Sequence, residues 1–127
     1  MHSNEDFLSF PIYKFEQNYK NEFLLNSLKN LSEFHFKNCK EYNKLIKSKN
    51  INIKNIKKVI NLPYLPVSLF KNYSLKSIPD QEIFKTLFSS GTTGQNLSKI
   101  FLDKNTANIQ SVALIKILQD LLGKSRL

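Results

Sequence analysis

The fold of this chain is decided by the stretch Glu82-Ile83-Phe84-Lys85-Thr86-Leu87-Phe88-Ser89-Ser90-Gly91-Thr92-Thr93-Gly94. Its first part carries β-forming side chains with apolar positions on both faces, so it predicts a strand over 82–88. The strand runs into a cluster of Ser, Gly and Thr. The whole chain contains 3 Gly, and two of them, Gly91 and Gly94, lie in this cluster. Glycines used so sparingly and then placed together indicate a special backbone conformation.

The residue types of this cluster are those that bind a phosphate group. Glycine lets the backbone approach closely, and successive backbone N–H groups form an anion-binding nest. Serine and threonine hydroxyls add donors, and a nearby lysine supplies a point charge for terminal phosphates. A preceding strand would hold the loop at its carboxyl end, where open α/β sheets bind ligands. The predicted phosphate-binding residues are Ser89, Ser90, Gly91, Thr92, Thr93, Gly94 and Lys99.

A plainer interpretation of the cluster is a polar hairpin loop that only joins two strands. The cluster is not a Walker A motif, because no Gly-Lys-Ser or Gly-Lys-Thr ending follows it. It also lacks the glycine spacing of a dinucleotide-binding fingerprint. The residue types alone therefore leave phosphate binding and a simple turn both open.

The residues after the loop predict a second strand and a helix. Lys99-Ile100-Phe101-Leu102 has the composition of a strand. Asp103 is a suitable N-cap for a helix that starts at Lys104, and Gly123 is a suitable stop. The residues expected to face inward on this helix are Ala107, Val112, Ile115, Leu118 and Leu122.

The residues before the strand predict a helical half and a proline-rich connector. From Glu16 to about Lys49 apolar or small residues recur every three or four positions, with a break expected near Asn38. The expected inward residues are Leu24, Leu28, Leu31, His35, Cys39, Tyr42 and Ile46. Residues 5–15 look like a short helix or turn that packs on something larger, and 48–58 like a loop leading into a short helix. Pro66 suits the first turn of another short helix.

These elements place the chain in the α/β class: a helical N-terminal half followed by strand, loop, strand and helix. We expect a single unit over 1–127, with helical residues 5–60, a connector over 61–67, and the strand, phosphate-loop, strand and helix over 82–123. Two strands alone are marginally stable in water. The strands therefore either pair with another segment or belong to something longer.

Composition narrows the partners and the compartment. The net charge is +9, but nearly all of the positive charge is Lys, and Arg126 is the only arginine. Arg is the preferred base-reading residue, so nucleic acid is not an expected partner. The single cysteine, Cys39, cannot form an internal disulfide, which suits a reducing compartment. No apolar run has the roughly 18 residues of a membrane span, and the N-terminus lacks a signal-peptide pattern, so we expect a cytoplasmic protein.

The string Ser90-Gly91-Thr92-Thr93-Gly94 resembles the signature of the adenylate-forming superfamily, which includes acyl-CoA synthetases and peptide-synthetase adenylation domains. The wider context is most similar to the acyl-protein synthetases of bacterial bioluminescence, the LuxE-type family. The matching stretches are 62–71, 84–95 and 98–103. The resemblance covers at least residues 62–123, about half of the chain, and the N-terminal helices are compatible with it. It implies that the chain is an N-terminal piece of an adenylate-forming enzyme fold.

The resemblance also implies a two-step reaction. A carboxylate, a fatty acid in the bioluminescence relatives, attacks the α-phosphorus of ATP and gives an acyl-adenylate and pyrophosphate; the acyl group then moves to a thiol. ATP with Mg²⁺ and an acyl carrier or acyl-transfer partner protein are the implied ligands and partners. The resemblance assigns hydroxyl contacts with the phosphates to Ser89, Ser90, Thr92 and Thr93, and the bend and amide contacts to Gly91 and Gly94. Oriented donors of this kind stabilise developing charge.

The sequence departs from the superfamily in two respects. Residues 95–99, Gln-Asn-Leu-Ser-Lys, replace the usual spaced Pro-Lys-Gly, so Lys99 is displaced and could instead belong to the strand that begins there. The adenine pocket, the acidic metal ligand and the acyl-accepting cysteine of the family lie downstream of the loop. Cys39 precedes the loop and is not that acceptor. We therefore expect a fragment that is inactive alone, and its catalytic residues stay unknown.

A different class of function stays open: a non-catalytic helical module that docks an acidic partner through its basic face. The stretch from Lys37 to Lys58 is rich in lysine, and it is otherwise simply a solvated surface. His35 and Cys39 are four positions apart on the apolar face, but two ligands do not make a zinc site, so no metal site is expected. Cys39 is expected to be a buried, inert thiol.

Overall fold

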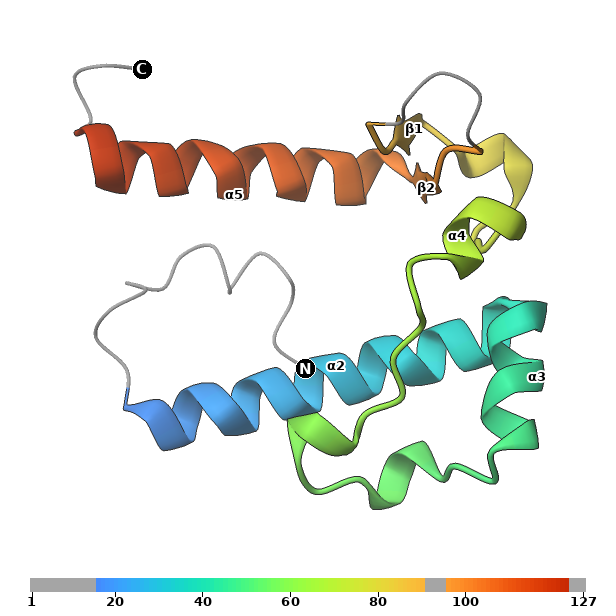
Figure 1. Ribbon diagram of the computed structural model, residues 1–127. Coiled ribbons are helices and arrows are strands. Elements are labelled where there is room, and N and C mark those ends of the chain that lie inside the picture. Colours follow the sequence, from blue (N-terminus) through green and yellow to red (C-terminus); the bar gives the residue numbers. More distant parts are fainter. Residues whose placement is uncertain (1–15, 91–95, 124–127) are drawn as a thin grey trace.

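The computed structural model describes residues 16–90 and 96–123. It has the predicted α/β order, with a helical N-terminal part followed by a strand, a loop, a second strand and a helix. Figure 1 shows two layers: helices α2 and α3 form the lower one, and the strands with helix α5 form the upper one. The segment that contains the short helix α4 joins them. The expected elements over 5–15 lie outside the described residues.

Two helices occupy the region predicted as helical, α2 (Gln17–Asn38) and α3 (Lys40–Ser48). The predicted break near Asn38 is confirmed, because Cys39 has extended backbone angles of φ −112° and ψ 111°. Asn38 contributes to this break: its side-chain Nδ2 donates to the carbonyl of Phe34 over 2.8 Å. An asparagine that bonds the nearby backbone offers the chain an alternative to continuing the helix.

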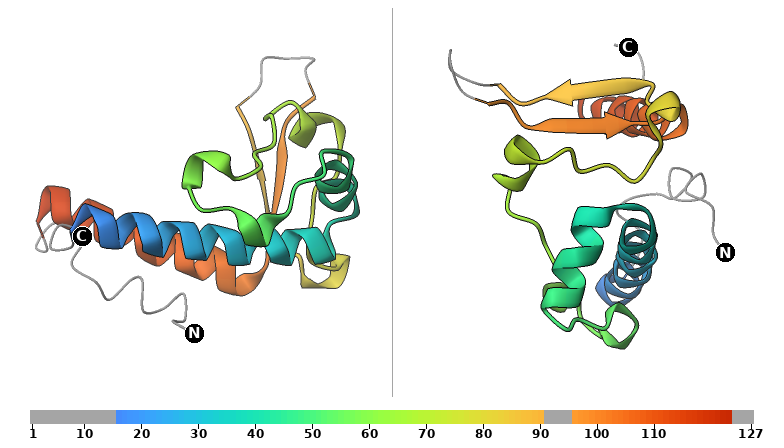
Figure 2. Two further views of the ribbon diagram at one scale, coloured as in Figure 1. Left: turned by 90° about the horizontal axis from the view of Figure 1, so that it is seen from below. Right: turned by 90° about the vertical axis from the view of Figure 1, so that its right-hand side faces the viewer.

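The break folds α3 against α2 and closes a small apolar core. The buried residues of this core are Cys39, Tyr42, Ile46 and Ile53. Two 3₁₀ turns, η1 (Ile53–Asn55) and η2 (Val59–Asn61), lead the chain back along α2 (Figure 2). Lys29 on α2 fastens the first of them, because its Nζ donates to the carbonyls of Lys54 (2.8 Å) and Ile56 (3.1 Å).

The inward face predicted from Glu16 to about Lys49 is only partly correct, because the residues that are buried follow α2. Cys39, Tyr42 and Ile46 are buried as expected, but Leu24 and Leu31 are nearly half exposed. The sequence pattern extends one straight stripe along the whole region, whereas the chain turns back at Cys39. The described elements that follow cover only part of α2, and they leave the rest of the stripe uncovered.

The connector leads to the hairpin through short turns. Helix α4 (Leu69–Asn72) follows Pro66, whose carbonyl accepts from the Leu69 N–H at 3.0 Å, so the predicted short helix is confirmed. A further 3₁₀ turn, η3 (Asp80–Glu82), occupies the place where the strand was expected to begin. The strand predicted over 82–88 is therefore shorter, because its first residues close turns onto Pro79 and Asp80 instead.

Strands β1 (Lys85–Phe88) and β2 (Lys99–Leu102) form an antiparallel hairpin, with Lys85 opposite Leu102 and Phe88 opposite Lys99. Because side chains alternate along a strand, this register puts Leu87, Ile100 and Leu102 on one face. The bounds predicted for the second strand are confirmed. Helix α5 packs on the face of Leu87 and Leu102, and α4 lies near β2. On the other face the Lys76 ammonium lies 6.0 Å from the ring centre of Phe101.

Helix α5 (Lys104–Leu122) begins and ends as predicted. The Asp103 carboxylate accepts from the Thr106 N–H at 2.7 Å, and Gly123 ends the helix with a φ of 80°. The prediction of inward residues on α5 is only partly correct. Ala107 is buried, but Val112, Ile115 and Leu122 are each exposed. A four-residue strand is about 13 Å long, whereas a 19-residue helix is about 28 Å long, so the hairpin covers only the first turns of α5.

Candidate functional site

The neck of the hairpin loop is the point where the chain leaves β1 at Ser89 and returns to β2 at Ser98. The Ser89 N–H donates to the Ser98 carbonyl at 3.1 Å. The return bond is made by a side chain, because the Ser98 N–H donates to Ser89 Oγ, also at 3.1 Å. The hydroxyl of Ser89 thus takes the place that its own carbonyl would have in a regular ladder. Serine side chains that replace a backbone acceptor end a strand and turn the chain away.

The structure places three of the seven predicted phosphate-binding residues. Ser89 and Ser90 stand exposed at the neck, and Lys99 is the first residue of β2. The other four predicted residues lie outside the described residues: Gly91, Thr92, Thr93 and Gly94. The neck therefore fixes where the loop starts and ends, and the predicted assignment of those four to phosphate contacts stays a prediction.

Lys99 lies on the opposite face of the hairpin from Ser89 and Ser98. It pairs with Phe88, whereas Ser89 and Ser98 are each one position further toward the loop, and side chains alternate along a strand. Its side chain is exposed. The interpretation that Lys99 belongs to the strand is confirmed, and its side chain lies on the face of the hairpin that does not carry α5.

Ser98 is a residue of the neck that the sequence analysis missed. It is 6% exposed, and its hydroxyl oxygen has no hydrogen-bond partner in the part of the chain that the structure describes. The strand register is the signal that would have identified Ser98. If Ser89 ends β1, the residue opposite Ser89 is the one that pairs with it at the neck of the loop. That register depends on the loop length, which the sequence pattern does not fix.

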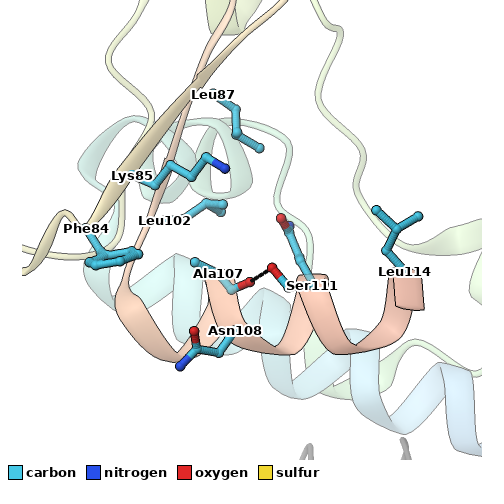
Figure 3. Close-up of a pocket in the computed structure, with 9 residues that line it drawn as sticks. Phe84, Lys85, Leu87, Leu102, Ala107, Asn108, Ser111 and Leu114 are labelled. Atoms are coloured by element: carbon cyan, nitrogen blue, oxygen red, sulfur yellow. Dashed lines mark hydrogen bonds between the residues drawn. The ribbon is translucent and has the colours of Figure 1, made fainter. Parts of the chain in front are cut away.

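A shallow groove of about 250 Å³ lies between the hairpin and the first turns of α5. Figure 3 shows Leu87 and Leu102 from the strands above Ala107 and Leu114 of the helix. The hydroxyl of Ser111 is already used, because it donates to the Ala107 carbonyl at 3.0 Å. Polar side chains also line the groove: Lys85, Asn108 and Gln110. The groove can therefore contact both apolar and polar parts of a ligand.

His35 lies where α2 meets the segment between α4 and η3. Its Nδ1 shares a 2.7 Å hydrogen bond with the Ser77 hydroxyl, and its ring meets Phe34 and Tyr42 edge-on. Burial lowers the pKa of His35 below its usual 6.5, because it penalises the charged imidazolium. These contacts give His35 a packing role.

Cys39 is a buried thiol, as predicted, and its Sγ lies 3.8 Å from a carboxylate oxygen of Glu41. A metal ion needs three or more suitable side chains together. Within residues 16–90 and 96–123, no three His, Cys, Asp or Glu side chains gather in that way. Neither Cys39 nor His35 is thus part of a metal-binding group in the described structure.

The lysine-rich stretch forms an exposed row on α3. Lys40, Lys44 and Lys47 are exposed and recur at helical spacing, and the buried Tyr42 and Ile46 occupy the other side of the helix. The row is charged and accessible. It therefore has the properties of a solvated face and equally those of a contact surface for an acidic partner.

Comparison with known proteins adds one finding. The family model described as acyl-protein synthetase, LuxE, matches residues 7–127. The chain matched none of the curated proteins and none of the solved structures with which it was compared. Among the helices of the described residues, none is long and apolar enough to cross a membrane.

Proposed function

Because this chain belongs to the acyl-protein synthetase family LuxE, we propose that it serves ATP-dependent acyl activation through the loop between β1 and β2. In this reaction a carboxylate oxygen attacks the α-phosphorus of ATP. A mixed anhydride, the acyl-adenylate, forms and pyrophosphate leaves. A thiol then takes the acyl group and AMP leaves. The family membership is the observation that carries the proposal, and we propose the loop that begins and ends at the hairpin neck as the site.

The neck supports this proposal because hydrogen bonds fix the two ends of the loop, and the loop sequence is rich in polar residues. Two hydrogen bonds, both at 3.1 Å, hold Ser89 against Ser98. Donors that are oriented before the ligand arrives stabilise phosphate charge without the cost of ordering them afterwards. In the proposed site Ser89, Ser90, Thr92 and Thr93 give hydroxyl contacts.

The remaining roles follow from chemistry and position. Gly91 and Gly94 give the bend and the amide contacts of the proposed site, and Lys99 supplies a positive charge from the other face of the hairpin. Mg²⁺ is proposed to arrive on the nucleotide phosphates, because phosphate oxygens and water supply most of its ligands in nucleotide sites.

We propose a fatty acid as the carboxylate and an acyl carrier or acyl-transfer protein as the partner. The groove beneath the hairpin supports an apolar acyl group, because Leu87, Leu102 and Leu114 line it. The reaction consumes ATP and needs a reduced thiol. Both are supplied by the cytoplasm, which we propose as its compartment.

The proposal is tested by measuring ATP and pyrophosphate binding with the purified protein, by calorimetry at fixed salt. We expect Thr92→Ala/Thr93→Ala to weaken binding at least about tenfold, because hydrogen bonds to charged groups contribute roughly 1.5–3 kcal/mol each. Ser27→Ala, which removes an exposed hydroxyl from α2, is the matched control and should bind as the parent does. A folded parent that binds neither ligand would refute the proposal.

A second candidate function rests on the lysine row of α3. We propose, as the alternative, that Lys40, Lys44 and Lys47 dock an acidic protein without catalysis. Such binding would weaken steeply as salt rises, because exposed charges are screened within about 8 Å at physiological ionic strength. Replacing the three lysines with glutamine should abolish binding of an acidic carrier protein and leave ATP binding unchanged. If ATP binding falls equally, the row and the loop are not separate sites.

A further inference from the structure

Ser98 has an environment unlike that of the other hydroxyls that the structure resolves. Its side chain is buried at 6% exposure, yet its Oγ lacks a hydrogen-bond partner within residues 16–90 and 96–123. Ser111 donates to a helix carbonyl, Thr106 donates to Asp103, and Ser77 bonds His35. Buried polar groups in folded proteins are rarely left unpaired, so each one that is unpaired calls for an explanation.

The position of the Ser98 hydroxyl offers an explanation for its lack of a partner. Ser98 lies opposite Ser89 at the neck of the loop, and the two are joined by the hydrogen bonds that close it. Alternation along the strands puts both side chains on the same face of the hairpin, opposite Lys99. The unpaired hydroxyl therefore lies where the polar loop meets the sheet.

The two serines have different capacities for a ligand. The oxygen of Ser89 already accepts the Ser98 N–H, which holds that side chain at the neck and leaves its O–H as a donor. The hydroxyl of Ser98 has its donor and both acceptor positions unused among the described residues. Phosphate oxygens are acceptors only, so an O–H donor without another partner is the complementary group.

We propose that Ser98 is a further phosphate-binding residue of this loop and that its O–H donates to a phosphate oxygen of ATP or pyrophosphate. Ser89 holds the neck through its oxygen, and its O–H remains one of the proposed phosphate contacts. The hydroxyl is covered in the ligand-free protein, so binding includes a rotation of the Ser98 side chain to another staggered rotamer. This inference rests on the proposed phosphate-binding function of the loop and names a residue that the sequence motif does not contain.

The test is Ser98→Ala, studied for both stability and binding. In the ligand-free protein the midpoint of thermal unfolding should stay the same or rise, because an unpaired buried hydroxyl is removed. Binding of ATP and of pyrophosphate should weaken about tenfold, as expected for the loss of one hydrogen bond to a charged ligand. Ser27→Ala is again the control and should change neither quantity.

The outcomes separate the two proposals. If the parent binds pyrophosphate and Ser98→Ala binds it equally well, the role of Ser98 is refuted and the loop proposal stands. If the folded parent binds neither ATP nor pyrophosphate, the loop proposal fails and the role of Ser98 fails with it. If Ser98→Ala lacks a cooperative unfolding transition, Ser98→Cys replaces it, since its thiol fills the space but is a weak donor. Loss of folding in both variants would make the hydroxyl structural and overturn the inference.

Discussion

The two layers of this molecule differ in how much of their apolar surface they bury. The layer of α2, α3, η1 and η2 closes a core around Ile46, which is 1% exposed. The layer of β1, β2 and α5 buries Leu102 and Ala107, but its helix leaves large apolar side chains uncovered by the described residues. The most exposed of them is Leu121, at 74%.

This difference separates the part of the fold that supplies stability from the part that carries the candidate site. Apolar burial is the main favourable term in folding, and the lower layer has most of it. Ligand-binding loops are drawn from the less stable parts of proteins, since they have to rearrange around a ligand. We therefore expect mutations in the lower layer to act globally and mutations near the hairpin to act locally.

The largest effect is expected from Ile46→Ala. Removing a fully buried isoleucine should cost about 2–5 kcal/mol of unfolding free energy, because a cavity is left as well as lost burial. Urea unfolding followed by circular dichroism measures this. Ile60, at 85% exposure, offers a matched control: Ile60→Ala should change stability by less than about 0.5 kcal/mol. Equal effects of the two substitutions would show that α3 does not hold the main core.

A smaller and more local effect is expected from Leu102→Ala. Leu102 is buried between the hairpin and α5, so the change should cost about 2 kcal/mol, at the low end of such substitutions. Amide hydrogen exchange should quicken in β1, β2 and the first turns of α5, with little change in α3. Leu121→Ala is the exposed control and should leave exchange as it was. Quicker exchange throughout α3 would contradict the separation of the two layers.

The sequence predicts best those features that depend on neighbouring residues. The strand at Lys99, the cap at Asp103 and the stop at Gly123 are each set by local backbone chemistry, and all three are confirmed. Strand β1 was predicted too long because the sequence did not reveal that Asp80 and Glu82 close a 3₁₀ turn. Such turns are decided by a few hydrogen bonds that no periodic pattern announces.

The sequence predicts poorly those features that depend on what packs against them. Leu24 and Val112 have helical apolar spacing, yet both are exposed, because spacing identifies a face and not its cover. Ser98 was missed for the same reason. Its burial and its place opposite Ser89 come from the register of two strands, which becomes known only when the hairpin is formed.

The helix cap at Asp103 offers a third and milder test of the upper layer. Asp103→Ala removes the acceptor of the Thr106 N–H, so unfolding free energy should fall by about 1 kcal/mol. Asp120→Ala, an exposed change near the far end of the same helix, is the control. Thermal unfolding of both variants gives the comparison. If Asp120→Ala lowers the unfolding free energy as much as Asp103→Ala does, the loss of a charge explains the effect and the loss of the cap does not.

The smallest effect is expected at His35, which bonds Ser77 in the segment between α4 and η3. Its folded pKa is lowered, so in the window between the folded value and the unfolded value of about 6.5 the unfolded chain binds more protons. Stability from the neutral ring is therefore complete above about pH 6.5 and falls as the pH drops through that window. Urea unfolding between pH 5 and 8 should show this slope in the parent and a shallower one in His35→Gln. The glutamine cannot titrate in this range but still offers a hydrogen-bonding group to Ser77, so an unchanged slope would place the titrating group elsewhere.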